Sequence, residues 1–189
     1  MKLSPHFTLG ELTKTKHVTA DGNIPSRVAI ENLIRVCGWL EALRARYNRL
    51  YVWNVEGGMW NENSHVALCA GVRPQSKVAG DCTLAPDPGA AAASRKEEPI
   101  VINSGYRSPE VNELAGGATN SNHLTGCAVD IRCAGKEQMI RYASILLDIA
   151  DGTKQDYDEL LLEQHGNVCW LHFAVRPKDN RRRISFLKA

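Results

Sequence analysis

The stretch Ser121-Asn-His-Leu-Thr-Gly-Cys-Ala-Val-Asp-Ile-Arg-Cys133 joins a polar turn to a short strand. Gly126 lets the chain turn, so we expect His123 in a loop and Asp130 on the strand that follows. The strand places Asp130 between Val129 and Ile131, where a carboxylate without a partner would be costly to bury. Something positive must therefore meet Asp130, and a divalent metal ion would do so.

A third ligand is available in the apolar segment Cys169-Trp-Leu-His-Phe-Ala-Val175. His172 lies in the middle of this predicted strand, and its neighbours Leu171 and Phe173 point to the opposite face. Two histidines and one aspartate would leave a zinc ion one open position for water. On spacing alone, a packed core histidine and a capping or ion-paired aspartate remain the alternative interpretation.

Helical periodicity is present on both sides of this motif. Apolar residues recur every three or four positions over 26–48 and over 136–151, where Gly152 is expected to end the helix. A short helix is predicted at 109–115. Strands are predicted at 99–103, 127–133, 160–163 and 169–175, with a hairpin turn at 165–167 joining the last two. This mixture predicts an α+β fold, with helices packed on a small antiparallel sheet.

The length of 189 residues suits one domain. Residues 54–98 show no sustained periodicity and contain Gly57-Gly58 and the run Pro86-Asp-Pro-Gly89. Segments of this length without regular structure are uncommon inside a compact domain. We therefore predict a single domain over 1–189 that carries an irregular insertion at about 54–98.

The six cysteines form no Cys-x-x-Cys pair, which argues against a zinc ribbon or a thioredoxin-like site. Without a visible export signal we expect free thiols, although a disulfide between Cys69 and Cys82 stays open. Thiolates bind zinc strongly, so cysteines on the ligand-bearing strands are competing ligands. These cysteines are out of phase with Asp130 and His172, and we interpret them as apolar packing residues: Cys127, Cys133 and Cys169.

The formal net charge of +2 gives no electrostatic reason to expect nucleic acid as a partner. The basic run Arg181-Arg-Arg183 is interpreted as a solvated tail. No apolar stretch is long enough to span a bilayer, so no membrane insertion is expected. The N-terminus has no apolar signal-peptide core, which predicts synthesis in the cytoplasm. Nothing in the sequence indicates an oligomeric state.

Three segments in order carry a resemblance to a known family. Ser121-x-His123-x-x-Gly-x-Ala-x-Asp130 follows Ser104-Gly-Tyr-Arg-Ser-Pro109, and Trp170-Leu-His172 comes last. Together with the opening Phe7-Thr-Leu-Gly-Glu-Leu-Thr13, they resemble the zinc D-alanyl-D-alanine carboxypeptidases, the M15 peptidases, and especially a branch common in phage lysins and bacterial genomes. The resemblance covers residues 5–50 and 99–176 and implies the hedgehog/DD-peptidase fold.

The resemblance implies roles for the matching residues. His123, Asp130 and His172 match the zinc ligands. Arg107 matches an arginine that contacts the substrate's carbonyl or carboxylate, a task that suits a permanently charged planar group. Ser121 is expected to line the substrate pocket.

The general base departs from the family pattern, because the acidic residue common three positions before the last histidine is Cys169 here. We expect Glu163, at the end of the preceding strand, to replace it. A structural ion pair with Arg107 or an exposed strand end is the alternative for Glu163. Asp158 and Glu159 are weaker candidates for the base, since we expect both to be exposed.

The family implies hydrolysis of peptidoglycan stem peptides, by a carboxypeptidase or by an endopeptidase. Arg107, or Arg73 in the insertion, could anchor a terminal carboxylate. Because no acid stands at position 169, a non-catalytic zinc-containing binding module of the same fold remains the second interpretation, and a metal-free structural protein the third. Since the substrate lies outside the cell membrane, we expect release through a membrane pore, as in phage lysins.

Overall fold

The computed structural model describes residues 1–52 and 97–188. The chain divides into two compact units, one of Met1–Tyr47 and Pro99–Ala189 and the other of Asn48–Glu98. The insertion predicted at 54–98 therefore lies outside the described residues, apart from its last two positions, as do Cys69, Cys82 and Arg73. In the second unit, the Asn48 side chain donates to Glu98 O at 3.0 Å and accepts from Glu98 N at 2.7 Å.

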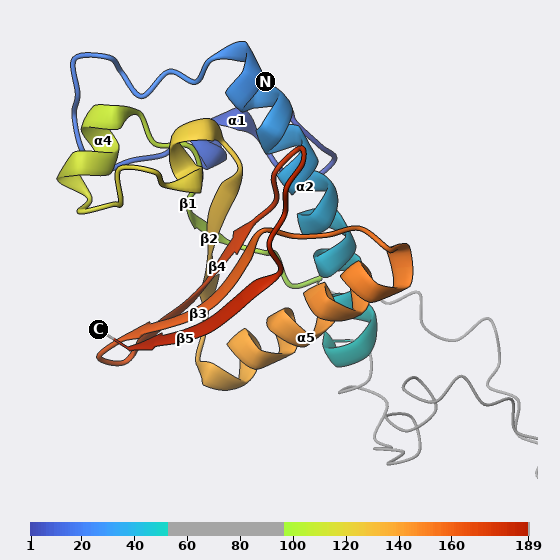
Figure 1. The fold of residues 1–189 in the computed structure, drawn as a ribbon. Coiled ribbons are helices and arrows are strands. Elements are labelled where there is room, and N and C mark those ends of the chain that lie inside the picture. Colours follow the sequence, from blue (N-terminus) through green and yellow to red (C-terminus); the bar gives the residue numbers. More distant parts are fainter. Residues whose placement is uncertain (53–96, 189) are drawn as a thin grey trace, which may run out of the picture. The chain divides into compact units, whose positions relative to one another are not determined.

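A five-stranded sheet organises the first unit (Figure 1). Its spatial order is β1-β2-β4-β3-β5, and all neighbours are antiparallel except β3 and β5, which run parallel. The strands are β1 (Ile102–Ser104), β2 (Ala128–Cys133), β3 (Glu159–His165), β4 (Val168–Ala174) and β5 (Arg183–Lys188). The predicted α+β class with a small antiparallel sheet is confirmed, whereas β5 was not predicted.

Helices α2 (Arg27–Tyr47) and α5 (Lys136–Thr153) pack on one face of the sheet (Figure 1). On that face the fully buried ring of Phe173 lies 5.3 Å from the Trp39 ring of α2. Tyr47 and Tyr142 join the two helices, with ring centroids 4.8 Å apart. Because side chains alternate along a strand, the opposite face of β2 and β4 carries Asp130 and His172. None of the helices in the described parts of the chain has both the length and the apolar character that a bilayer crossing needs.

The predicted helix bounds differ from the observed ones by at most two residues. Helix α4 (Pro109–Leu114) begins after Ser108, whose side chain accepts from Val111 N. We predicted that α5 ends at Gly152. The helix instead continues to Thr153, and Lys154 takes the left-handed conformation with φ 56°. The hairpin prediction is confirmed, since β3 pairs antiparallel with β4 and Gly166 turns with φ 57°.

The cysteines of the described residues are packing residues, as predicted. Cys37, Cys127, Cys133 and Cys169 are all buried free thiols. Cys133 and Cys169 lie opposite each other across β2 and β4. They are out of phase with the two ligand candidates, and burial raises the pKa of Cys133 to about 12. A protonated, buried thiol on the helix-covered face does not compete for a metal ion on the other face.

Candidate metal centre

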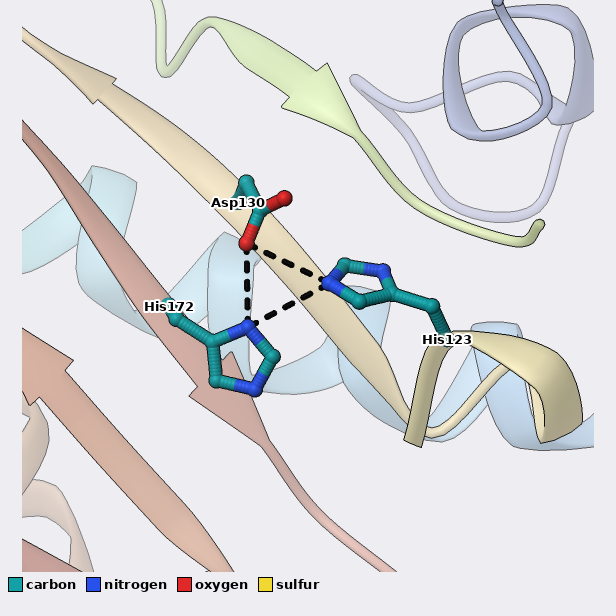
Figure 2. Close-up of side chains that lie close together, drawn as sticks. All are labelled: His123, Asp130 and His172. Carbon is teal, nitrogen blue, oxygen red and sulfur yellow. Dashed lines mark hydrogen bonds and ion pairs between the residues drawn. The ribbon is translucent and has the colours of Figure 1, made fainter. Parts of the chain in front are cut away.

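Three side chains from separate elements converge on one point (Figure 2). His123 comes from the 3₁₀ helix η2 (Asn122–Thr125), Asp130 from β2 and His172 from β4. His172 Nδ1 lies 2.9 Å from Asp130 Oδ1, and His123 Nε2 lies 3.3 Å from each of these atoms. All three residues are buried. The structure thus brings together the three predicted ligands.

The triangle of donor atoms has the size that a metal ion requires. Ligand atoms at a zinc–ligand distance of about 2.0–2.1 Å are about 3.3 Å apart in tetrahedral geometry. The observed separations of 2.9 and 3.3 Å match this value closely. Two imidazole nitrogens and one carboxylate oxygen are also donors that zinc accepts. The group can therefore bind a metal ion and leave a fourth position open.

His123 is fixed by the turn that carries it. The Ser121 side chain caps η2 by accepting from His123 N, and Gly126 ends η2 in the left-handed conformation with φ 71°. A Cβ atom at Gly126 would lie 2.4 Å from the carbonyl oxygen of Ala29. Only glycine suits both the conformation and the close approach. Ser121 is partly exposed, and its predicted contact with substrate stays a prediction.

The segment Ser104-Gly-Tyr-Arg107 supports two of the ligands. His123 Nδ1 donates to Gly105 O at 2.6 Å, which leaves Nε2 with its lone pair toward the other donors. Tyr106 N donates to Leu12 O at 2.7 Å, and a Cβ atom at Gly105 would lie 2.4 Å from that oxygen. Leu12 belongs to α1 (Leu9–Leu12), in the opening motif. The two motifs of the resemblance therefore contact each other at the site.

Arg107 binds the third ligand. Its Nη2 donates to Asp130 Oδ2, while its Nε donates to Ser104 Oγ at 2.8 Å. The second carboxylate oxygen of Asp130 is thus taken up, and Oδ1 faces the histidines. Arg107 does not form the ion pair with Glu163 that was the alternative for that glutamate. Its other N–H groups form no hydrogen bond with the described residues, so they can contact a substrate carbonyl or carboxylate.

The electrostatics of the site favour a cation. Burial alone would raise the pKa of Asp130, but His123 and His172 hold it well below its usual range. Burial likewise opposes the charged form of His172, yet Asp130 and Glu159 raise the pKa of this imidazole to about 9. The Asp130 carboxylate thus favours a positive charge at this point, and a metal ion would supply one.

Two glutamates flank His172 on the same sheet face. The register pairs His172 with Leu161, Trp170 with Glu163 and Ala174 with Glu159. Burial first, and then the charge of Asp130, raise the pKa of Glu163, while His172, Arg107 and Trp170 act in the opposite direction. The electrostatic environment of Glu163 therefore includes Asp130, His172 and Arg107.

Asp158 and Glu159 are not exposed, so that prediction was wrong. Asp158 is fully buried, and its carboxylate accepts from Arg181 at 2.7 and 2.8 Å and from Asn122 at 2.7 Å. Glu159 Oε2 lies 3.6 Å from His172 Nε2. Contact with His172 lowers the pKa of Glu159 to about 2, with Asn122 and Arg181 acting in the same direction.

The arginines of the basic run are exposed, as predicted for a solvated segment, but they are ion-paired and do not form a tail. Arg181 pairs with Asp158 and Glu159, Arg182 with Asp151 and Asp156, and Arg183 with Glu159. The run leads into β5, and its side chains meet acids that lie far away in sequence. Asn122, Glu159 and the arginines were missed because local composition does not reveal these partners. The sequence offered one signal that Asn122 belongs to the site, namely its position directly before His123.

An α+β fold with a buried His₂Asp donor group fits the class of catalytic metal sites, in which three protein ligands leave one position open. The Peptidase M15 family model matches residues 90–156 and supports the family predicted from the motifs. The match includes Arg107, His123 and Asp130 and ends before Glu163 and His172. The match supports the interpretation of the protein as a metal-dependent peptidase. A search of curated proteins gave no match.

Proposed function

We propose that the protein is a zinc metallopeptidase that hydrolyses peptide bonds in bacterial peptidoglycan stem peptides. The observation that carries the proposal is the triangle of His123, Asp130 and His172, with edges that suit one tetrahedral ion. The match to Peptidase M15 supports the reaction class. The likeness of the motifs to the phage-lysin branch supports the substrate class, and release through a membrane pore would bring the protein to the cell wall.

The reaction divides among the residues of the site. A zinc ion, when bound, supplies activation of water and polarisation of the scissile carbonyl. Glu163 accepts the proton of the attacking water on its carboxylate and delivers it to the leaving amine. Arg107 holds Asp130 and offers its remaining N–H groups to the oxyanion or to a substrate carboxylate.

The test combines metal analysis with hydrolysis of purified peptidoglycan. We expect about one zinc ion per chain and the appearance of new amine termini. Chelation should stop this hydrolysis, and added zinc should restore it. Release of free D-alanine would identify a carboxypeptidase, whereas new amines within the stem without D-alanine would identify an endopeptidase.

Two variants separate metal binding from proton transfer. His123→Ala should lose both the metal and hydrolysis. Glu163→Gln should keep the metal and lower kcat by about 10²–10⁴-fold, because general acid–base catalysis contributes that much. Glu137→Gln on α5, which removes an exposed carboxylate that pairs with Arg141, is the matched control and should keep full activity.

If the protein binds zinc but hydrolyses nothing, the enzyme hypothesis fails and the non-catalytic binding module takes its place. Full activity in the Glu163→Gln variant would remove Glu163 from the mechanism. Undiminished hydrolysis after thorough chelation would refute the metallopeptidase itself.

A further inference from the structure

We propose that Glu159 is a positioning residue that holds His172 with Nδ1 toward the metal ion, and that Arg181 and Arg183 hold Glu159 in turn. This inference rests on the proposed function, because it requires an ion at His123, Asp130 and His172. It adds a role that the motifs do not contain, since neither Glu159 nor the arginines belong to them.

The orientation of the His172 ring creates the need for such a residue. Nδ1 faces Asp130 and His123, so a metal ion would take the lone pair of Nδ1 and leave the proton on Nε2. Nε2 is buried and has no hydrogen-bond partner within 3.5 Å among the described residues. Its nearest charged neighbour is Glu159 Oε2, at 3.6 Å. Carboxylates commonly accept the second N–H of a metal-bound histidine and fix its ring and tautomer.

Both carboxylate oxygens of Glu159 have further partners. Asn122 Nδ2 donates to Oε2 at 2.9 Å. Arg181 and Arg183 approach Oε1 at 2.9 and 3.3 Å. Asn122 also accepts from Arg176 Nε at 2.9 Å, so the amide cannot turn away without losing a contact. The carboxylate therefore has little freedom to leave the His172 ring.

The same contacts separate Glu159 from Glu163. Glu159 faces Nε2, the side of the ring away from the metal position, and two arginines share its charge. Glu163 forms no ion pair among the described residues, and it responds to the charges of Asp130 and Arg107. One glutamate is thus engaged in holding a ligand, whereas the other is available to accept a proton.

The experiment measures zinc affinity by competition with a chelator and does not need the substrate. Glu159→Ala should weaken zinc binding by about 10–100-fold, the range typical for loss of such a partner. Glu159→Gln keeps an acceptor oxygen and should lose less. At saturating zinc, both variants should recover kcat to within a few-fold of the parent, because Glu159 does not touch the reacting atoms.

The arginine run provides a matched pair of variants. Arg183→Gln removes a contact to Glu159 and should weaken zinc binding by a few-fold. Arg182→Gln removes the same charge from the same run, but its partners are Asp151 and Asp156, and zinc affinity should not change. In long-range ¹H–¹⁵N spectra of the zinc-bound parent, His172 should carry its proton on Nε2.

The possible results are distinguishable. If the parent binds no zinc, the proposed function fails, and the role of Glu159 falls with it. If the parent binds zinc and the Glu159→Gln and Glu159→Ala variants bind it equally well, only the positioning role is wrong. If Glu159→Gln retains zinc affinity but loses kcat at saturating zinc, Glu159 acts in proton transfer and the assignment of the two glutamates is reversed. Should Glu159→Ala not fold, Glu159→Gln and the His172 spectrum decide.

Discussion

Each metal-ligand candidate has a second contact that fixes its direction. His123 donates to the backbone of Gly105, the second oxygen of Asp130 binds Arg107, and Nε2 of His172 faces Glu159. Each of these contacts comes from a neighbouring protein group and restricts the direction of one donor, so together they preorganise the triangle. A preorganised site of this kind loses little freedom on binding.

At the residue scale, Asp158 gives a prediction about pH. Burial opposes its charge, but hydrogen bonds from Arg181 and Asn122 and the charge of Arg176 hold the pKa of Asp158 below the ordinary 3.8. A carboxyl whose pKa is lower in the folded state adds stability that is present above about pH 4 and lost at lower pH. Asp158→Asn should therefore cost about 1–3 kcal/mol of unfolding free energy at pH 7.

The cost of Asp158→Asn should shrink as the pH falls below about 4, because the Asp158 carboxyl of the unfolded chain takes up a proton there before that of the folded protein does. Urea unfolding at pH 7 and at pH 3 measures both values. Asp148→Asn, on the exposed side of α5, is the control and should change little at either pH. An equal cost of Asp158→Asn at both pH values would contradict the ionic explanation.

At the element scale, the turn at Gly126 decides where His123 lies. Its φ of 71° and the approach to the Ala29 carbonyl both exclude a side chain. Gly126→Ala should lower the unfolding free energy by about 1–3 kcal/mol or more. It should also weaken zinc binding, because η2 must shift to relieve the contact.

Gly152→Ala is the opposite case and serves as the control. Gly152 lies within α5, and a Cβ atom there meets nothing within 4 Å. Alanine at this position should stabilise the protein by about 0.5–1 kcal/mol, because it suits a helix better than glycine does. Denaturation of both variants checks the pair, and a tolerated Gly126→Ala substitution would show that the turn can relax.

The same scale shows which elements were predictable. Helices α2 and α5 and strands β2 to β4 were predicted because their apolar spacing reflects burial on one face. Strand β5 gave no such signal, since Ile184 and Phe186 are exposed. The ligands and Arg107 were predicted because they belong to recognisable motifs. The contacts of Glu159 were not predicted, because its partners lie on elements that are distant in sequence: η2, β4, β5 and the segment just before β5.

At the scale of the whole molecule, a bound ion would join η2, β2 and β4. Any ligand that binds only the folded state stabilises it, by about 2.7 kcal/mol when the free ion is at 100 times its Kd. We therefore expect the urea midpoint of the metal-free protein to rise with zinc concentration. His123→Ala should abolish that rise, and an unchanged midpoint in the zinc-loaded parent would contradict the assigned site.

The order of the donors along the chain has a consequence for biosynthesis. His172 follows Asp130 by 42 residues. A polypeptide leaving the ribosome thus exposes its first imidazole and the carboxylate while the last imidazole is still untranslated. Two donors retain a divalent cation much less firmly than three. Tight capture must wait until β4 has emerged and paired with β2, so the nascent chain has no completed centre before that point.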